Sequence, residues 1–590
     1  MGTLEVDVLV LGSGLAGSAA AICARRRGRT VCLLSEGPTC SGSSFSGRTW
    51  GLGFVTPGGP GPASLAREVS RVGRGMNDPR LTAALCEGAE GSVAFLESLG
   101  ARLETPRDPG QREFVPCFDS RARSWHGFLP GTWAPLLREA LEGEAHRQAA
   151  PLAPVALLPR AHALSLLADA GGRVSGCLAI DGRGRPVAVL ARQTVVACGG
   201  YAGLWGSHLC ADEDRGVCHA LAADAGARLS NLEFVQLMLG ADANGRLVVH
   251  NEKGFRWTRL TDAETGRSVF SEMGVDDRRA RSALEAHAGH GPFTSRLPSS
   301  LVEVTLARFR EAHPGRACVA TLDEGLLGQG ARPEFVDSYL AWLRDSCGVP
   351  AGAPLPLREC AHSCNGGVAI DVGCHTAVPG LLACGEAACG VHGADRIGGL
   401  ASVTAVTFGR IAGETAAAEA GPLPTPPGDR RLLLASPLLL PRDASADPAG
   451  ARACAPADER GEGATGRPDL EAGWRAIGRA LDAGCLAVRT DEGLRRADEG
   501  LSLLQGALEE AGRESPRELE RALAELDGMD ARRLREAARA SEMLLATRLA
   551  RAVASAMRAR TESRGSHFRA DFPAEDPAQA RPAQASWGVG

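Results

Sequence analysis

The stretch that decides the fold is VDVLVLGSGLAGSAAAICARRRGRTVCLLSE, residues 6–36. Its first part, Val6–Leu11, is apolar and mostly β-branched apart from one aspartate, the pattern of a strand buried on both faces. A GxGxxG turn at Gly12–Gly17 follows, then an alanine-rich helix over Ser18–Arg27 and a second strand over Thr30–Leu34. This strand–turn–helix–strand order predicts a Rossmann-like unit that binds a dinucleotide.

Each glycine of the turn has a physical role. Gly12 allows the tight turn, Gly14 lets the backbone approach a pyrophosphate, and Gly17 lets helix and strand pack closely. Leu15 and Ala16 begin the helix, whose N-terminus supplies an anion site. We therefore expect these five residues to bind the cofactor.

The residues after the second strand leave the nucleotide open. An acid usually binds the ribose hydroxyls there, but here Ser35 takes that place and Glu36 follows, so both NAD and FAD remain possible. A second glycine turn, Gly199–Gly200, ends another apolar strand after the hairpin-like segment 173–189. Two such turns, far apart in the sequence, favour an FAD domain. We expect Ser35, Glu36, Gly199 and Gly200 to lie near the cofactor.

Composition excludes several functional classes. The 590 residues have a formal net charge of −5, which gives no electrostatic case for nucleic acid or an anionic membrane. No apolar run approaches the roughly 20 residues of a spanning helix, so no membrane insertion is expected. The 18 cysteines are scattered without a CxxC pair, so we expect no metal site, neither an iron–sulfur cluster nor a structural zinc ion.

The charged residues narrow the possibilities further. Lys253 is the only lysine; it lies in no GxxxxGK[ST] context, which excludes a Walker phosphate site, and it is the one Schiff-base candidate. The segment Met1–Asp7 carries acids rather than the basic start of an export signal, so the expected location is cytoplasmic.

Three later segments carry a family resemblance. They are HSCNGG at 362–367, PGLLACGEAACGVHGADRIGGLASVTAVTFGR at 379–410, and RTESRGSHFR at 560–569. In order and spacing they resemble the flavoprotein family of succinate dehydrogenase, fumarate reductase and L-aspartate oxidase. The resemblance covers nearly the whole chain, and its last two motifs are specific.

The resemblance implies the fold class and the domains. It implies an α/β protein in which a Rossmann-like FAD-binding domain is interrupted by an α+β capping domain and followed by a helical domain. The expected boundaries are 1–230 and 355–420 for the two parts of the FAD-binding domain, 231–354 for the cap, 421–468 for a linker or loops, and 469–590 for the C-terminal helices. Leu470, Trp474, Ile477 and Leu481 repeat at helical spacing, which predicts core packing in that last domain.

The resemblance also implies roles for individual residues. Arg396 matches the arginine that clamps a substrate carboxylate, for which a guanidinium fork is well suited. His362 matches a histidine that touches the same carboxylate, and Glu386 matches the acid that binds the sugar chain of the flavin. The further residues expected to contact FAD are Ser41, Ser43, Gly385, Gly398, Ala401 and Ser402.

Several positions depart from the family pattern. Gly42 stands where succinate dehydrogenases attach FAD through a histidine, which implies a noncovalent cofactor. Met238 replaces a substrate histidine and can neither donate a hydrogen bond nor carry charge. The Thr-Glu pair of the family cannot be identified in residues 248–265. The proton-shuttle arginine has its best match near Asp276, with Arg278 or Arg279 as the candidates.

Three hypotheses follow. The first is an FAD-dependent oxidoreductase whose small carboxylate substrate is not succinate or fumarate, because only one carboxylate-binding end is visible. The second is a genuine succinate, fumarate or L-aspartate oxidoreductase. The third is a non-catalytic or electron-transferring subunit of a larger complex. Because the chain has no cluster-binding cysteines, electrons must pass from the flavin to a soluble acceptor, or to a separate iron–sulfur or other electron-transfer subunit. Such a subunit could also hold the chain at the inner membrane.

Overall fold

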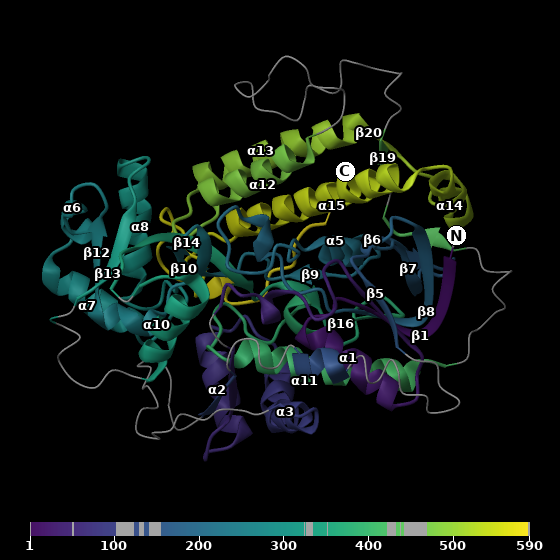
Figure 1. Ribbon diagram of the computed structural model, residues 1–590, viewed down its shortest axis with the longest axis horizontal. Coiled ribbons are helices and arrows are strands. Elements are labelled where there is room, and N and C mark those ends of the chain that lie inside the picture. The colour runs from purple at the N-terminus through teal and green to yellow at the C-terminus, as the bar shows by residue number, and fades with distance from the viewer. Residues whose placement is uncertain are drawn as a thin grey trace.

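The structure is a computed structural model, and two domains and a helical layer are visible in Figure 1. The cap, in teal, lies at one end, the large sheet lies at the other, and the C-terminal helices α12, α13 and α15 run along one side. The structure describes residues 2–49, 52–101, 123–128, 135–140, 155–323, 325, 334–350, 352–421, 432–436, 438–441 and 469–587. This arrangement confirms the predicted fold class.

The predicted strand–turn–helix–strand unit is present at the start of the chain. It consists of β1 (Gly2–Leu11), α1 (Leu15–Arg26) and β2 (Val31–Ser35), with β1 and β2 parallel. Gly12 has φ +107°, and a Cβ there would lie 2.3 Å from the carbonyl oxygen of Ala197. Only glycine fits this turn, because the backbone of the neighbouring strand end passes directly against it.

An eight-stranded sheet forms the centre of the FAD-binding part of the chain. Its order is β18-β6-β7-β8-β1-β2-β5, and β16 pairs with β8. The pairs β5–β2, β2–β1, β1–β8 and β8–β16 are parallel, whereas the pairs β8–β7, β7–β6 and β6–β18 are antiparallel. The further strands are β5 (Ala156–Pro159), β6 (His162–Ala168), β7 (Val174–Ile180), β8 (Pro186–Val196), β16 (Leu381–Ala383) and β18 (Leu433–Leu434).

Helices cover both faces of this sheet. On one face α1 packs along α11 (Leu400–Glu419), where a Cβ at Gly409 or Gly413 would lie 2.4 or 2.3 Å from a carbonyl oxygen of α1. These two glycines let the helices touch backbone to backbone, which brings both N-termini to the same edge of the sheet. On the other face lie α5 (Val217–Asp224) and α15 (Ala531–Ala559). Below α11 in Figure 1 lie α2 (Pro62–Val72) and α3 (Pro79–Ser98), which contact β3 (Leu52–Pro57), and β3 pairs antiparallel with β4 (Arg123–Phe128).

The cap is a second, smaller α+β unit. Its five-stranded sheet has the order β11-β10-β14-β13-β12, built from β10 (Val235–Ala243), β11 (Arg246–Val249), β12 (Thr258–Asp262), β13 (Cys318–Leu322) and β14 (Leu355–Cys364). Its helices are α6 (Val269–Glu272), α7 (Asp277–His287), α8 (Ser300–Ala312) and α10 (Glu334–Cys347). The expected boundary after residue 354 falls directly before β14, which pairs with both β10 and β13.

The C-terminal part is mostly helical. It contains α12 (Leu470–Gly484), α13 (Asp491–Ala511), α14 (Leu519–Asp527) and the long α15. Ile477 and Leu481 are fully buried, which confirms that this stripe packs in the core. In the expected linker, β18 joins the large sheet, and β19 (Leu439–Pro441) pairs with β20 (Gly512–Glu514). Among the described residues, no helix combines the length and the apolarity that crossing a membrane requires.

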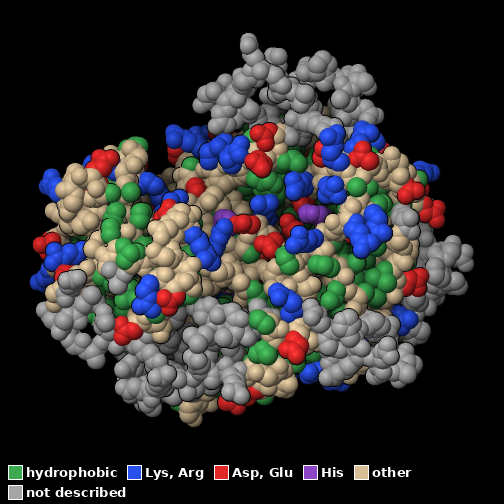
Figure 2. All heavy atoms as spheres, viewed as in Figure 1, with side chains coloured by type: hydrophobic (Ala, Val, Ile, Leu, Met, Phe, Trp, Pro, Cys, Tyr) green, Lys and Arg blue, Asp and Glu red, His purple; other side chains and the backbone are tan. Residues whose placement is uncertain are grey.

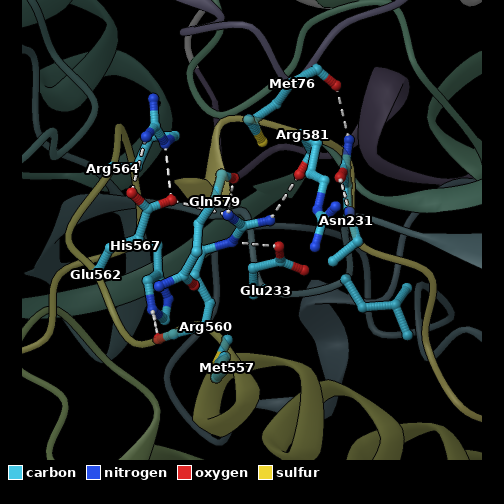
Figure 3. Close-up of polar contacts among 12 residues, drawn as sticks. Met76, Asn231, Glu233, Met557, Arg560, Glu562, Arg564, His567, Gln579 and Arg581 are labelled. Carbon is cyan, nitrogen blue, oxygen red and sulfur yellow. Dashed lines mark hydrogen bonds and ion pairs between the residues drawn. The ribbon is translucent and has the colours of Figure 1, made fainter. Parts of the chain in front are cut away.

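The terminal RTESRGSHFR motif folds back onto the start of the cap (Figure 3). Arg560 donates from Nε to Glu233 at 2.6 Å and from Nη1 to Glu562 at 2.8 Å. Arg564 donates to both oxygens of Glu562, at 2.8 and 2.7 Å. Glu233 and Glu562 are fully buried, so these ion pairs fix the connection from which the cap sheet begins.

Candidate functional site

A cavity of about 480 Å³ lies between the FAD-binding domain and the cap, and it collects most of the predicted site residues. This size suits a bound cofactor and substrate. Gly17 and Gly200 do not line the cavity themselves but pack against residues that do. A Cβ at Gly17 would contact Gly12, and one at Gly200 would contact Glu386. The predicted residues that line the cavity are Gly12, Gly14, Leu15, Ala16, Ser35, Glu36, Ser41, Ser43, Gly199, His362, Gly385, Glu386, Arg396, Gly398, Ala401 and Ser402.

Two helix N-termini point into this cavity. Gly14 caps α1 and Gly399 caps α11, and neither helix has a side-chain cap on its first N–H groups. A Cβ at Gly14 would meet nothing closer than 3.9 Å, and one at Gly398 would meet nothing within 4 Å, so the backbone is open toward the cavity at both ends. Uncapped N–H groups and the helix dipoles favour negative charge there, as a pyrophosphate or an electron-rich ring would supply. The residues therefore fit a flavin dinucleotide.

Two carboxyl groups of the cavity lining, those of Glu386 and Asp214, interact electrostatically. Glu386 accepts a hydrogen bond from the backbone N–H of Cys364 at 2.8 Å, and burial raises its pKa. Asp214 is hydrogen bonded to Ser43, and burial followed by the proximity of Glu386 raises its pKa well above the usual range. Carboxyl groups that keep a proton can donate as well as accept, which suits the hydroxyl groups of a sugar chain.

A third acid stands where β2 ends. Burial, and then the nearby Glu542, raises the pKa of Glu36. His162 Nδ1 lies 2.7 Å from Glu542, and this hydrogen bond raises the pKa of His162 although burial alone would lower it. The potential ligand atoms of these three residues lie within 4.8 Å of one another, but the histidine and Glu542 already satisfy each other. We interpret the group as the wall at the ribose end of the cavity.

Arg396 and His362, the residues expected to bind a substrate carboxylate, both line the cavity. Nε of Arg396 donates to Gln236 Oε1 at 2.8 Å, and Ser363 Oγ donates to the same oxygen at 3.1 Å. Burial, together with the charge of Arg396, lowers the pKa of His362 to about 3, so this imidazole is neutral and cannot add a second positive charge. His392 also lines the cavity, and the same two causes lower its pKa to about 3.

The structure does not bring Arg278 and Arg279 to the cavity. Both side chains are exposed on α7, whose buried face is formed by Ala280, Ala283 and Leu284. Neither arginine is among the residues that line the cavity. The helix is capped by Asp276 at this end, and the apolar spacing of its inner face turns both arginines outward.

The cap supplies further residues to the cavity lining, of which the sequence had singled out only Met238 and Lys253. Met238 and Val249 contribute an apolar wall, as expected for Met238, while Glu252, Lys253 and His290 add polar groups. The side chain of Glu252 packs against Gly291, and Lys253 Nζ donates to the carbonyl oxygen of Ala288 at 3.1 Å. One signal for part of this was present. Asn-Gly at 244–245 predicts a tight hairpin, and the hairpin of β10 and β11 returns the chain to the cavity at Asn251.

The surface around the cap and the helical layer carries both signs of charge. Figure 2 shows arginines and acids interspersed over this face, with histidine visible only in small patches. No extended region of one sign covers the part of this face that the structure describes, which agrees with the nearly balanced composition.

Comparisons with known proteins agree with this site. A family profile described as "FAD binding domain" matches residues 7–401, and one described as "Fumarate reductase flavoprotein C-term" matches residues 474–587. The chain is 29% identical to an L-aspartate oxidase of Caulobacter vibrioides over 580 residues, covering 97% of this chain and 94% of that protein. It is 27% identical to an L-aspartate oxidase of Mycobacterium bovis over 596 residues, covering 98% and 94% of the two chains.

Solved structures share the fold. The FrdA chain of Escherichia coli quinol fumarate reductase superimposes with a TM-score of 0.70 at 20% identity, covering 98% of this chain and 94% of that chain. Fold and site together define an FAD-dependent oxidoreductase. The chain belongs to the FAD-binding flavoprotein family of fumarate reductase, succinate dehydrogenase and L-aspartate oxidase.

Proposed function

We propose that this enzyme exchanges a hydride between noncovalently bound FAD and a carbon atom next to the carboxylate of a small acid. The observation that carries the proposal is that Arg396 and His362 line the same cavity as the glycines of the dinucleotide turn. A substrate held by these two side chains therefore lies in the space that the cofactor would share.

The bound flavin would supply the two-electron chemistry, and the protein supplies position and charge. Arg396 binds the carboxylate and stabilises negative charge that develops beside it, because its guanidinium is buried and held in place by Gln236. The neutral imidazole of His362 contributes a hydrogen bond without charge. Met238 and Val249 belong to one apolar cluster, and the part of the lining that they form excludes water.

The residue at position 42 supports noncovalent binding. Gly42 lines the cavity beside Ser41 and Ser43, and it has no side chain that could attach to a flavin ring. The open backbone at Gly14 and Gly398, with the acids Glu386 and Asp214, offers contacts that hold the cofactor without a covalent bond.

L-Aspartate oxidation is the second candidate function. The relatives named L-aspartate oxidase match nearly the whole chain, and Lys253 offers the cavity a second cationic group besides Arg396. A second cationic group would suit a substrate with a second carboxylate. Against this, Met238 offers no hydrogen bond, and this favours a monocarboxylate or a bulkier acid.

The experiment is anaerobic reduction of the purified, FAD-loaded protein by a panel of acids. L-Aspartate, succinate, L-alanine and propionate are mixed with the protein while flavin absorbance near 450 nm is followed, and fumarate is tested with reduced viologen. We expect one class of acid to exchange electrons with the flavin, and Arg396→Met to lower kcat/KM by about 10²–10³-fold, as loss of a charge-stabilising group does. Arg279→Met is the matched control, because Arg279 is exposed on α7.

Two results would contradict the proposal. Failure of the reconstituted protein to show any flavin absorbance would exclude FAD chemistry. A different result would be tight FAD binding without electron exchange with any acid. If the Arg396→Met variant then left the activity of an isolated complex unchanged, an electron-transferring or structural role within that complex would be favoured.

A further inference from the structure

Part of the cavity lining is a small group of apolar side chains that the proposed carboxylate binding does not use. Leu209, Met238 and Val249 all line the cavity, and each is at most 8% exposed. They pack together with the buried Cys360 and the partly buried Leu247, separately from the large cores of the two domains. We refer to the three lining residues as the apolar cluster.

The backbone places the apolar cluster beside His362. Met238 in β10 pairs with Cys360 in β14, two residues before His362. The backbone N–H of Leu209 donates to the carbonyl oxygen of Ala361 at 2.8 Å, and Ala361 directly precedes His362. A carboxylate bound at His362 therefore has the apolar cluster as a close neighbour within the same cavity.

The side chains of the apolar cluster donate no hydrogen bond to a ligand. Leucine and valine have no polar side-chain atom, and the thioether of Met238 is only a weak acceptor. His250 follows Val249 in the chain, but its ring packs against Phe255 and Tyr339, with centroid distances of 4.8 and 6.2 Å, and does not line the cavity. A carboxylate against this cluster would lose its water without gaining a partner, whereas a hydrocarbon group would gain from burial.

The shape of this wall is fixed by close packing. A Cβ at Gly240 in β10 would lie 2.6 Å from Sγ of Cys360, 2.9 Å from Leu247 and 3.3 Å from Leu209. These side chains close directly over the glycine, so the wall cannot shift to present polar groups without disturbing β10 and its neighbours.

Two charged residues of the cap also line the cavity. Lys253 Nζ donates to the carbonyl oxygen of Ala288 at 3.1 Å, and Glu252 packs against Gly291. A second carboxylate of a substrate would have to bind at Lys253, where the neighbouring Glu252 carries a negative charge. Binding of a second carboxylate at Lys253 and binding of a hydrocarbon group at the apolar cluster are therefore the two alternatives that an experiment has to separate.

We propose that the apolar cluster is a binding subsite for a hydrocarbon group, so that the substrate is a monocarboxylic acid with an aliphatic chain rather than a dicarboxylic acid. Arg396 and His362 hold the carboxylate at one end. The aliphatic chain extends from there onto Leu209, Met238 and Val249. This inference rests on the proposed function, of which it names the substrate class.

The first test measures binding without turnover. Propionate, butyrate and valerate are titrated into the FAD-loaded protein in a calorimeter, together with succinate and glutarate, the diacids that match butyrate and valerate in carbon number. We expect the affinity of the monocarboxylates to rise about fourfold with each methylene group, as burial of a CH₂ implies. Butyrate and valerate should bind at least about tenfold more tightly than their matched diacids, because the second carboxylate would lose its water at the cluster.

The second test changes the apolar cluster. Met238→His and Val249→Thr each introduce a polar group, and we expect each to lower the ratio of valerate to glutarate affinity about tenfold. Met238→Leu stays apolar and should keep the ratio within about threefold of the unaltered protein. Val302→Thr is the matched control, because Val302 is buried in α8 and does not line the cavity. The Tm and FAD affinity of every variant are measured alongside.

The outcomes separate the inference from the proposed function. Equal or tighter binding of succinate or glutarate by the unaltered protein overturns the inference, and the proposed function stands if such an acid reduces the flavin. Met238→His and Val249→Thr variants that weaken FAD binding but keep the affinity ratio also overturn it, because the cluster then faces the cofactor. If the monocarboxylates bind in the expected order but no acid, L-2-aminobutyrate and L-aspartate included, reduces the flavin, the proposed reaction fails while the binding subsite is retained.

Discussion

The side chain of Gln236 joins the cap to Arg396, the proposed carboxylate clamp, because its Oε1 accepts a hydrogen bond from Nε of Arg396 at 2.8 Å. Its Nε2 donates to Asp395 and to the backbone carbonyl of Arg396, at 3.1 and 3.2 Å. Gln236 lies in β10 of the cap, whereas Arg396 belongs to the FAD-binding domain. The position of the Arg396 guanidinium therefore depends on how the cap packs against the FAD-binding domain.

Replacing Gln236 should loosen this clamp. In Gln236→Leu the guanidinium loses a charged hydrogen bond worth about 1.5–3 kcal/mol, so we expect kcat/KM to fall about 10–100-fold while FAD content stays normal. Steady-state kinetics and the flavin-to-protein absorbance ratio measure both. Gln505→Leu, which removes hydrogen bonds to Glu509 and Arg551 among the C-terminal helices, is the control and should leave both values unchanged.

A side chain at Gly14 should exclude the cofactor but spare the fold. A Cβ there would point into the cavity and meet nothing closer than 3.9 Å in the protein, so Gly14→Val fills space that the pyrophosphate needs. We expect the Kd for FAD to rise at least about 100-fold, as loss of several anion contacts implies, with the Tm of the apoprotein nearly unchanged. Equal FAD affinity in the variant would contradict the assignment of this turn.

Acid precipitation tests the mode of attachment. Because Gly42 offers no side chain for a bond to the ring, precipitation of the loaded protein with trichloroacetic acid should leave all the flavin in the supernatant. Fluorescence of the washed pellet measures the remainder. A yellow, fluorescent pellet would mean that another residue forms a covalent link.

Glu359 should make stability fall as pH rises. It is buried, and burial outweighs its pairing with Arg310 to raise its pKa from 4.5 to about 7. The folded state then keeps a proton that the unfolded state loses between pH 4.5 and 7, so this group's stabilising contribution is complete below pH 4.5 and is lost by about pH 7. Glu359→Gln removes this dependence of stability on pH. The free energy of unfolding of the variant minus that of the unaltered protein should therefore rise by on the order of 2–3 kcal/mol between pH 5 and pH 8. Urea unfolding at the two pH values measures it, and equal differences would contradict it.

Arg560 should be essential for the junction of cap and C-terminal tail. Arg560→Ala leaves Glu233 buried without its ion-pair partner, which typically costs about 3–5 kcal/mol of unfolding free energy. Arg558→Ala, which removes the solvent-exposed pair with Asp491, should change stability little. Chemical denaturation of the two variants provides the comparison, and similar losses in both would contradict a special role for the buried pair.

The sequence by itself determined the cofactor half of this protein. The strand, glycine turn and helix at residues 6–27 are set by local periodicity and by backbone conformations such as that of Gly12, and such local rules can be read without a structure. The same holds for Arg396 and Glu386, which lie in contiguous motifs. Their meeting in one cavity follows from the order of the strands.

Only the tertiary structure decided what the cap contributes. Arg278 and Arg279 fit a sequence pattern but lie on the outer face of α7, because the apolar side of that helix must turn inward. His290 reaches the cavity on a loop of no distinctive sequence, and the Asn-Gly turn that predicts the hairpin before Lys253 does not indicate which side chains line the cavity. The pairing of His290 with Asp395 joins residues more than a hundred positions apart, and such contacts are set by how two domains pack, which local propensity does not encode.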